Sequence, residues 1–440
     1  MTITEYLFIF LGVPVGLVCG LLPSISMSVA LIGMYGILLG VPFDTAISFF
    51  IVGHITVYFS ASVLALWIGV AGDPSTFPIL SERDKIIKNN LLGTALKRTA
   101  QASAISSICG LVMLFSFMYF ISGVVDIFIY THTSAALLTI MFIISLFWKS
   151  NKFYINLFLV IASVIIGNIG YHLKIGKSFL VFDNPALFGG IPLVPVILGM
   201  YAFPIMYDAF IESKNRQKNN NEYFELVVPK ENVPFLPVIR GTIMGFFMGL
   251  VPLFGSSVSS NAIYFVENKI KNNTALDKIT SAESANNASA VSLLAPLLIL
   301  GVAILPSEMV LLSILQDNGW TIGHITFHTF VLLTFSIIVA IICCYILCVN
   351  YAVKLVAIFD RYQRTILIFF VAVMVWGIYN NGDMIAQSNF YIIILILSTI
   401  VGFIMRKLSI NPIPFIIGFL LSTKALDVYL RSYSLILSSF

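Results

Sequence analysis

Residues 12–23 read GVPVGLVCGLLP, and residues 241–252 read GTIMGFFMGLVP. Both stretches have the spacing G-x3-G-x3-G-x2-P, with a constant offset of 229 residues between them. A second pair follows in the same order, GVAGDPS at residues 69–75 and GVAILPS at residues 301–307, with an offset of 232. Glycines four residues apart also serve the ordinary packing of membrane helices, but two paired motifs at nearly one offset indicate an internal duplication.

The composition places this duplicated chain in a lipid bilayer. Of 440 residues, 59% are hydrophobic and only 10% are charged, and the mean hydropathy is +0.99. Apolar runs such as residues 102–122, 330–349 and 390–405 approach the roughly 20 residues that span a bilayer. We therefore predict an all-α polytopic membrane protein of about 10–14 membrane segments, including discontinuous or re-entrant helices. The net charge of +4 lies in short loops, so no nucleic-acid partner is predicted.

Loop charge indicates that the two halves have opposite orientations. In the first half, residues 39–46 contain no Lys or Arg, whereas residues 81–98 contain five. The pattern reverses in the second half, where residues 267–279 contain three and residues 316–326 contain none. Because cytoplasmic loops collect Lys and Arg, residues 81–98, 212–232 and 267–279 are predicted to be cytoplasmic.

This reversal predicts two inverted-topology repeats, a plan common among secondary transporters. The predicted organisation is a first transmembrane repeat at residues 1–211, a polar linker at residues 212–235 and a second transmembrane repeat at residues 236–440.

The two GVA motifs are predicted to be breaks in membrane helices. Such breaks persist only where protein or a wet cavity surrounds them. A Pro-Ser pair suits a helix start, and a helix N-terminus directs N–H groups and a positive dipole end at an anion. The breaks are therefore expected to face one central anion site, although simple kinks and close packing would also explain them. The substrate-binding candidates are Ser24, Ser26, Ser75, Gly255, Ser256, Ser284, Asn286, Asn287 and Ser307.

Residues 281–292, SAESANNASAVS, form a polar stretch that leads into the second break. Polar side chains at membrane depth are costly unless they serve a function. Glu283, His54 and Asp73 are candidates for cation binding or proton relay. The alternatives are that Glu283 caps a helix near the headgroups and that His54 is a hydrogen-bonded core histidine. Neither the five cysteines, which lack CxxC spacing, nor the histidines predict a metal site.

Several stretches resemble the large membrane subunit (permease) of the bacterial tripartite tricarboxylate transporters. These stretches are ESANNASA from Glu283, RGTIMGFFMGLVP at residues 240–252, GIPLVPVILGMYAF at residues 190–203 and VGFIMRKLSINPIPFIIGFLL at residues 401–421. The family usually has Pro-Gly where this chain has Pro23-Ser24 and Pro252-Leu253. These departures fall at the expected binding loops and leave the substrate unassigned.

The resemblance implies a multi-pass protein of the bacterial inner membrane that imports small carboxylates, of the tricarboxylate or dicarboxylate class, by secondary active transport. The coupling ion would be Na⁺ or H⁺, and no other cofactor is expected. The implied partners are a periplasmic substrate-binding protein and a small four-helix membrane subunit; the oligomeric state is left open. The alternatives are an intramembrane transferase and a channel-like or non-transporting scaffold. An enzyme is not predicted, because no compact acid–base or metal constellation is found.

Overall fold

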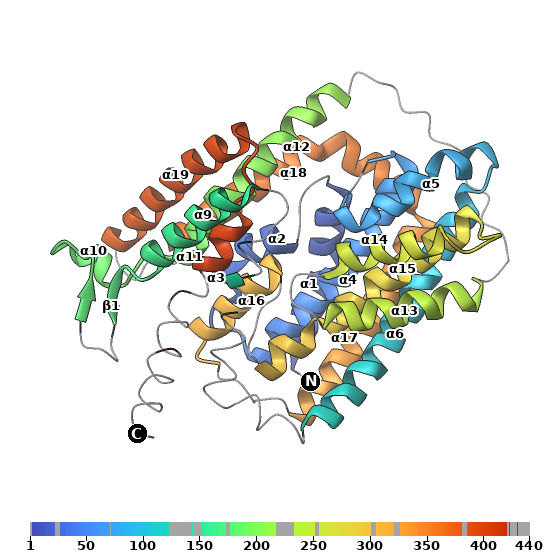
Figure 1. Ribbon diagram of the computed structural model, residues 1–440, viewed down its shortest axis with the longest axis horizontal. Coiled ribbons are helices and arrows are strands. Elements are labelled where there is room, and N and C mark those ends of the chain that lie inside the picture. Colours follow the sequence, from blue (N-terminus) through green and yellow to red (C-terminus); the bar gives the residue numbers. More distant parts are fainter. Residues whose placement is uncertain are drawn as a thin grey trace. The chain divides into compact units, whose positions relative to one another are not determined.

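The computed structural model describes most of the chain. The residues outside the description are 1, 23–26, 71, 123–138, 140, 141, 144, 145, 147–150, 173–176, 217–232, 251–254, 301–304, 321–325, 381–384, 420, 421, 423–428 and 430–440. Among the described residues, the structure is almost entirely helical (Figure 1). By length and composition, six of the described helices can cross a membrane. The prediction of an all-α polytopic membrane protein is therefore confirmed.

The chain forms two compact units, and each contains segments from both sequence halves. Unit 1 comprises Met1–Leu31, Leu38–Tyr119 and Asp208–Phe369, and unit 2 comprises Ile32–Ile37, Phe120–Tyr207 and Phe370–Phe440. The predicted boundaries at residues 211 and 236 stay a prediction.

The first half of the sequence contains α1 (Ile3–Leu21), α2 (Met27–Gly33), α3 (Tyr35–Leu38), α4 (Phe43–Trp67), η1 (Pro74–Thr76), α5 (Phe77–Lys88), α6 (Leu92–Ser122), α9 (Phe153–Gly167), β1 (Gly170–His172), β2 (Lys177–Phe179), α10 (Pro185–Phe188), α11 (Leu193–Ile197), η2 (Leu198–Ala202) and α12 (Phe203–Arg216). The second half contains α13 (Phe235–Gly249), α14 (Gly255–Glu267), α15 (Ala275–Ser292), η3 (Pro296–Leu300), α16 (Pro306–Asp317), α17 (Phe327–Tyr345), η4 (Ile346–Asn350), α18 (Ala352–Asn380) and α19 (Ile385–Lys407).

Local signals fix where several of these helices begin. Helices α1, α15 and α17 each start behind a threonine whose hydroxyl accepts a backbone N–H of the first turn, in a capping box. These threonines are Thr2, Thr274 and Thr326. The proline of each GVA motif also starts a helical turn, because Pro74 opens η1 and Pro306 opens α16.

The duplicated glycines pack two pairs of helices in the same register. A Cβ added at Gly16 of α1 would lie 2.5 Å from the carbonyl oxygen of Gly53 in α4. A Cβ added at Gly245 of α13 would meet the carbonyl oxygen of Ala285 in α15, which is 232 residues beyond Gly53. The other ladder glycines repeat this pattern, with Gly12 on Phe49 and Gly241 on Ser281, and with Gly20 on Val57 and Gly249 on Ser289. Equivalent glycines therefore contact equivalent backbone positions in the two halves.

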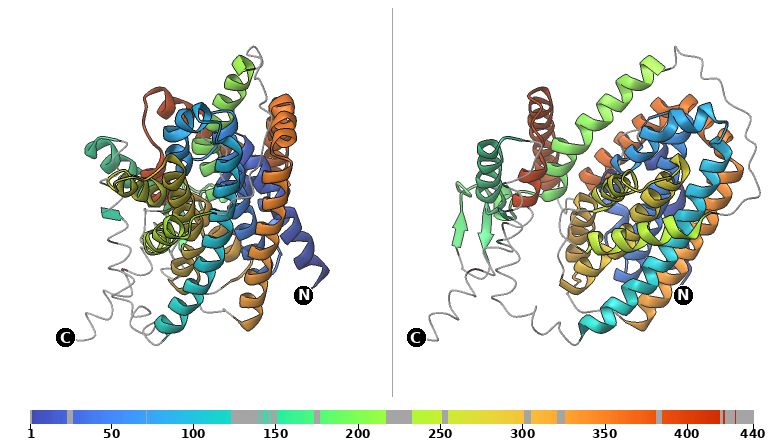
Figure 2. Two further views of the ribbon diagram at one scale, coloured as in Figure 1. Left: turned by 90° about the vertical axis from the view of Figure 1, so that its right-hand side faces the viewer. Right: turned by 45° about the vertical axis from the view of Figure 1, so that its right-hand side comes forward.

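Helix α5 connects the end of α4 to the start of α15. The Arg83 guanidinium donates to the last carbonyl groups of α4, with Nε 3.0 Å from the Leu66 oxygen and Nη2 2.8 Å from the Trp67 oxygen. The neighbouring residue, Glu82, accepts from Lys278 in the first turn of α15 at 3.4 Å. The C-terminal end of α4 therefore lies beside the N-terminal end of α15 (Figures 1 and 2).

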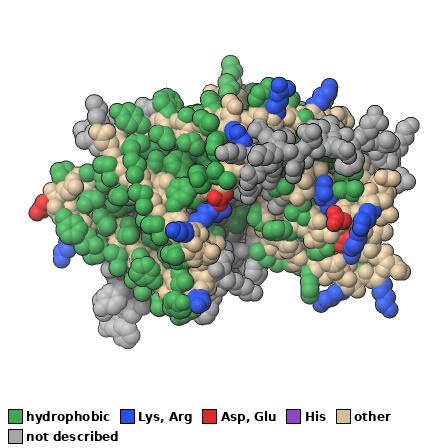
Figure 3. Space-filling view, turned by 90° about the horizontal axis from the view of Figure 1, so that it is seen from above, with side chains coloured by type: hydrophobic (Ala, Val, Ile, Leu, Met, Phe, Trp, Pro, Cys, Tyr) green, Lys and Arg blue, Asp and Glu red, His purple; other side chains and the backbone are tan. Residues whose placement is uncertain are grey.

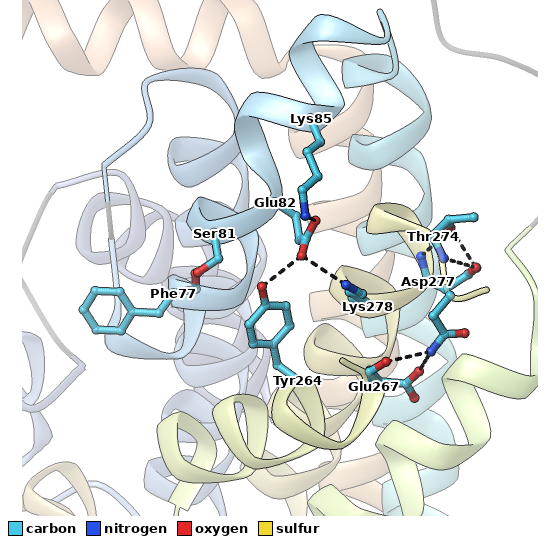
Figure 4. Close-up of polar contacts among 10 residues, drawn as sticks. Phe77, Ser81, Glu82, Lys85, Tyr264, Glu267, Thr274, Asp277 and Lys278 are labelled. Carbon is cyan, nitrogen blue, oxygen red and sulfur yellow. Dashed lines mark hydrogen bonds and ion pairs between the residues drawn. The ribbon is translucent and has the colours of Figure 1, made fainter. Parts of the chain in front are cut away.

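Around this junction, unit 1 has a group of charged contacts that we call the Glu82 cluster: Glu82, Lys85, Arg98, Tyr264, Asp277 and Lys278. The buried Glu82 carboxylate accepts from the Tyr264 hydroxyl at 2.9 Å and pairs with Lys85 at 2.8 Å (Figure 4). Arg98 pairs with Asp277 at 3.4 Å. The two Lys-rich loops at residues 81–98 and 267–279 therefore meet.

The two loops without Lys or Arg also meet, in a group we call the Asn318 cluster: Leu38, Gly40, Val41, Asp44, Asn318, His328 and Thr329. The Asn318 amide nitrogen donates to the Leu38 and Val41 oxygens at 3.0 and 3.1 Å. Its amide oxygen accepts from the Gly40 N–H at 2.7 Å. Asp44, in the first turn of α4, accepts from Thr329 at 2.6 Å.

Unit 2 packs α9, α11 and η2 against α19 and a short segment around Phe415 and Phe419. Strands β1 and β2 pair antiparallel, with Tyr171 opposite Ser178. Helix α19 exposes an apolar stripe at helical spacing, formed by Ile393, Ile396, Leu397, Ile400 and Ile404. Broad apolar areas on the molecular surface (Figure 3) are suited to contact with lipid.

Candidate functional site

Helix α15 combines a polar sequence with complete burial. From Thr280 to Ser292 every residue is buried. Seven of the side chains between residues 281 and 292 are polar: Ser281, Glu283, Ser284, Asn286, Asn287, Ser289 and Ser292. Glycines of α13 cover one side of the helix, and α14 packs along it. Buried polar groups persist only where they are hydrogen-bonded or where they have a function, so α15 is the strongest candidate for a binding site.

The Glu283 carboxylate is the centre of a hydrogen-bond network that joins three helices. Its Oε2 accepts from Ser62 of α4 at 2.7 Å, and its Oε1 accepts from Ser103 of α6 at 2.9 Å. The Asn287 amide nitrogen donates to the same Oε1 at 3.1 Å and to Ser103 Oγ at 2.9 Å. Glu283 lies in the third turn of α15 and is 2% exposed. It does not cap a helix near the headgroups, so that alternative is wrong.

Asn286 differs from Asn287 in that its side chain has no hydrogen-bond partner among the described residues. Its side chain is fully buried, and neither Nδ2 nor Oδ1 bonds to any described residue. A buried amide left unsatisfied costs roughly 1–3 kcal/mol. Both polar atoms of the Asn286 amide are therefore without a described partner, whereas only Oδ1 of Asn287 is, because Asn287 Nδ2 donates to Glu283.

His54 of α4 is the residue that the 232 offset aligns with Asn286. Its Nε2 lies 2.8 Å from the Tyr58 hydroxyl, and its ring packs between Phe50 and Tyr58. Its Nδ1 is buried and has no hydrogen-bond partner among the described residues. His54 thus combines the packing of a core histidine with one free polar atom.

At the first break, the side chain of Asp73 caps the helical turn that follows it. Asp73 Oδ1 accepts the Ser75 backbone N–H at 2.8 Å and caps the turn η1. Ser75 is buried, and its hydroxyl has no hydrogen-bond partner among the described residues. One of the N–H groups expected to bind an anion is therefore engaged by Asp73.

At the second break a carboxylate also accepts a backbone N–H, but it belongs to a residue at a different position in the motif. The offset aligns Asp73 with Leu305, which would make an acidic site one-sided. Glu308, in the first turn of α16, accepts the Leu305 backbone N–H through Oε2 at 2.9 Å. A glutamate one turn along the helix therefore reaches the backbone position that the offset aligns with Asp73.

Helix α14 contacts both breaks. Ser260 Oγ donates to the Ser75 carbonyl oxygen at 2.7 Å. At the first residue of α14, Gly255 has a φ of +46°, and a Cβ added there would lie 2.8 Å from Leu305 Cδ2. Glycine is required here both by the backbone angle and by this approach. Ser256 lies 3.3 Å from Ser289 of α15 through their hydroxyls.

The remaining predicted site residues are Ser24, Ser26, Ser284 and Ser307. Ser24 and Ser26 lie outside the described residues. Ser284 is buried but donates to the Thr280 carbonyl of its own helix at 2.9 Å, and Ser307 is buried in α16. The site roles of all these residues stay predictions.

Sequence reasoning missed Ser62, Ser103, Tyr58 and Glu308. The Tyr58 hydroxyl lies 2.8 Å from His54 Nε2. The serines carried no signal, because isolated serines are common in membrane helices. Glu308 could have been found as a carboxylate directly after the second GVA motif.

A protein-family model matches nearly the whole chain. Residues 6–417 match the model of the family described as "Tripartite tricarboxylate transporter TctA family". The chain belongs to the TctA family. This TctA member is therefore a component of a tripartite transporter and a multi-pass membrane protein, as the resemblance of its motifs predicted.

One curated relative matches nearly the full length of this TctA chain. It is an Agrobacterium vitis protein described as "Uncharacterized 52.8 kDa protein in TAR-I ttuC' 3'region", with 22% identity over 450 residues. The match covers 98% of this chain and 87% of the relative. No solved structure has significant similarity to the chain.

Proposed function

We propose that this chain is the substrate-translocating subunit of a carboxylate importer driven by a cation gradient. The observation that carries the proposal is the buried polar helix α15, which presents the unpaired Asn286 amide and the Glu283 network inside a member of the TctA family. A scaffold has no need for unsatisfied polar groups in its interior, since each one lowers its stability.

Recognition of the carboxylate is assigned to neutral donors. No Lys or Arg occurs in either GVA motif or in residues 281–292. Asn286, the Ser75 hydroxyl and His54 supply polar atoms without described partners. Neutral donors hold an anion less tightly than a buried guanidinium would, which suits a transporter that must release its substrate.

Two pairs of loop contacts support an inverted arrangement of the halves. The equivalent loops at residues 39–46 and 267–279 lie in different clusters, the first in the Asn318 cluster and the second in the Glu82 cluster. The last turns of α4 lie beside the first turns of α15, with Ser62 bonded to Glu283, which supports opposite directions for these equivalent helices. Helix α4 has 25 residues and is about 37 Å long, sufficient to separate the clusters by one bilayer.

The inverted arrangement is testable by labelling single cysteines introduced into a cysteine-free chain in intact cells. Cysteines at Lys88 and Lys271 are expected to react only after the membrane is made permeable, and a cysteine at Pro42 to react from outside. Reaction of positions 88 and 271 from opposite sides would refute the inversion.

The proposed partners are those of a tripartite system: a periplasmic substrate-binding protein and a small membrane subunit. The proposed location is the bacterial inner membrane, with the Glu82 cluster on the cytoplasmic side because of its Lys and Arg residues. The coupling ion is proposed to be Na⁺ or H⁺.

Reconstitution into proteoliposomes tests the function. The chain, its small subunit and its binding protein are expected to accumulate labelled di- or tricarboxylate only when a cation gradient is imposed. Uptake that equilibrates without accumulation would indicate a channel. Absence of any uptake, with the complex intact, would favour a scaffold.

A further inference from the structure

We propose that the Glu283 carboxyl group takes up and releases a proton at Oε2, and that this proton is the cation that drives carboxylate import. The inference rests on the proposed function, because it names the coupling ion that this function requires. The sequence indicated Glu283 as a candidate for cation binding or proton relay without a choice between Na⁺ and H⁺. The hydrogen bonds around the two carboxylate oxygens favour the proton.

The two oxygens of the Glu283 carboxylate have different surroundings, and Oε1 is fixed as an acceptor. It accepts from Ser103 Oγ at 2.9 Å and from Asn287 Nδ2 at 3.1 Å. Asn287 Nδ2 also donates to Ser103 Oγ at 2.9 Å, which leaves the Ser103 hydrogen to point at Oε1. Oε1 therefore accepts hydrogen bonds in either protonation state, and it is the carbonyl oxygen of the protonated group.

Oε2, in contrast, contacts a hydroxyl group that has two acceptors. Ser62 Oγ lies 2.7 Å from Glu283 Oε2 and 3.0 Å from the carbonyl oxygen of Tyr58, one turn earlier in α4. A hydroxyl group has one hydrogen and two lone pairs, so Ser62 donates to one of these oxygens at a time. When it donates to Tyr58, its lone pair faces Oε2 across 2.7 Å, a normal O–H···O length.

The network therefore has a place for one more proton. A proton from the aqueous phase forms an O–H bond at Oε2 of Glu283, this group donates to Ser62 Oγ, and Ser62 donates to the Tyr58 carbonyl oxygen. The only other change is rotation of the Ser62 hydroxyl group, and no heavier atom has to move. Both protonation states are thus hydrogen-bonded, which suits a group that changes between them in every transport cycle.

The charge of an ionised Glu283 has no cationic hydrogen-bond partner among the described residues. Its donors Ser62, Ser103 and Asn287 are neutral, and Glu283 is 2% exposed. An isolated charge in a protein interior is costly, and a proton removes that cost. Three basic side chains on α15 and on adjoining helices are paired with other carboxylates: Lys278 with Glu82, Arg98 with Asp277 and Arg240 with Glu267.

Other titratable groups lie on the elements packed against α15, but none of them is hydrogen-bonded to the Glu283 carboxylate in the described part of the chain. The two on α4 share a helix face with Ser62, at a spacing of four residues. These groups are His54 and Tyr58 of α4, Asp73 before η1, Glu82 of α5 and Tyr264 of α14.

The surroundings of Glu283 suit a proton better than Na⁺. Hydrogens of three donors, rather than oxygen lone pairs, face the ionised carboxylate. In transporters built from inverted repeats, carbonyl groups of unwound helices coordinate Na⁺, but α15 is continuous from Ala275 to Ser292. A sodium ion would require these donors to turn away, whereas a proton requires the rotation of one hydroxyl group.

Glu283→Gln tests the coupling with a side chain that imitates the protonated form. Its amide nitrogen can donate to Ser62, and its amide oxygen can accept from Ser103 and Asn287, so the variant is expected to fold. The reconstituted complex is expected to lose accumulation driven by a pH gradient while keeping exchange of labelled for unlabelled carboxylate. Asp84→Asn, which neutralises an exposed carboxylate of α5, is the matched control and is expected to retain both activities.

Two transport results would overturn the proposal. The first is accumulation by Glu283→Gln that a pH gradient drives at the wild-type rate, since Glu283 would then serve only the packing of three helices. The second is wild-type accumulation that follows a Na⁺ gradient at fixed pH and does not respond to a pH gradient.

Infrared difference spectroscopy of the purified chain detects the proton without transport. Lowering the pH is expected to produce the carbonyl stretch of a protonated carboxyl group, in a band that Glu283→Gln lacks. Ser103→Ala removes a hydrogen bond to Oε1 and is expected to move this band to higher frequency, which assigns the band even if Glu283→Gln does not fold. Ser106→Ala, on the same helix, removes a hydroxyl that bonds only to a backbone carbonyl and is expected to leave the band in place.

The spectra separate this inference from the proposed function. If the wild-type complex imports no carboxylate but the band responds to pH and moves in Ser103→Ala, the proposed function fails and the proton site stands. If the pH-difference spectra of the wild type, Glu283→Gln and Ser103→Ala are the same wherever the chain is folded, Glu283 exchanges no proton and the inference is wrong.

Discussion

Helices α4 and α15 are equivalent in packing but differ in the density of the polar side chains that they bury. Both are buried along most of their length, and each receives a glycine ladder in the same register, from α1 and α13 respectively. Yet α4 is an apolar candidate span, whereas α15 carries seven buried polar side chains between residues 281 and 292. Small residues thus set the packing of both copies, while the buried carboxylate of Glu283 and both buried asparagines of the pair lie on α15. Substitutions of the glycines that pack both helices and substitutions of the polar residues of α15 should therefore have different effects.

The largest expected effect is on folding, and it should be the same in both halves. Gly16→Leu and Gly245→Leu each place a side chain against a neighbouring backbone, and overpacking of this kind costs about 1–3 kcal/mol or more. Both variants are expected to reduce the yield of folded protein in detergent, measured by size-exclusion fluorescence. Gly189→Ala is the control, because a Cβ added there has no atom within 4 Å. If only one of the two leucine variants misfolds, the helix pairs are not equivalent.

The second prediction concerns function and should separate the two helices. Asn286→Ala removes no hydrogen bond to a described residue, so the variant is expected to fold normally. Loss of one hydrogen bond to a charged substrate costs about 1.5–3 kcal/mol, which lowers uptake about 10- to 100-fold. Thr280→Val, on the same helix, removes a hydroxyl that bonds only to the Leu276 carbonyl and is expected to keep uptake. Wild-type uptake by Asn286→Ala would remove α15 from the site.

Asn287→Ala is expected to lose uptake by a different route. Its amide donates to Glu283 and Ser103, so its loss also disturbs the carboxylate network. A change in the cation dependence of uptake is expected for Asn287→Ala but not for Asn286→Ala. The same dependence in both variants would show that the two amides do not have separate roles.

A third, smaller effect tests what α4 contributes to the chemistry of α15. Ser62→Ala removes a donor at 2.7 Å from Glu283, and a hydrogen bond to a charged group contributes about 1.5–3 kcal/mol. The Tm of the purified chain is expected to fall. Ser60→Ala is the control on the same helix, because its hydroxyl bonds only to backbone carbonyls. Equal Tm values for the two variants would mean that Ser62 does not support the carboxylate.

The smallest effect is expected at the junction of the two helices. Burial opposes the charge of Glu82, but hydrogen bonds from Lys85 and Tyr264 and the charge of Lys278 lower its pKa overall. The unfolded value is about 4.3, so the stabilising contribution is present above that pH and is lost as pH falls through the lower folded pKa. Glu82→Gln is expected to flatten the dependence of Tm on pH below about 4.3. An unchanged slope would show that the Glu82 cluster does not stabilise the fold.

Much of the fold could be predicted from the sequence because repeated small residues report close helix contacts directly. The glycine spacing indicated the duplication. Gly16 and Gly245 are separated by the first offset, and the residues that they contact, Gly53 and Ala285, are separated by the second. Loop charge indicated which loops share a side, and the loops of like charge content are in contact.

The site was less predictable, because its geometry depends on contacts between distant segments. The polarity of α15 was visible in the sequence, and the roles of its residues stay predictions. Ser62 and Ser103 are distinguished from other membrane serines only by their distance to Glu283. Glu308 was missed because alignment by offset compares residue positions, whereas a side chain one helical turn away reaches the same backbone group.

The change of offset from 229 to 232 arises at a single turn between helices. Helix α3 ends at Leu38 and α14 ends at Glu267, still 229 residues apart, but α4 and α15 begin 232 residues apart. The connection at residues 39–42 is therefore three residues shorter than the one at residues 268–274, which carries Lys269 and Lys271. The two copies therefore differ in length at a turn between helices, where lengthening a loop costs little free energy. The turn that differs in length also differs in charge, as do the equivalent loops at residues 81–98 and 316–326.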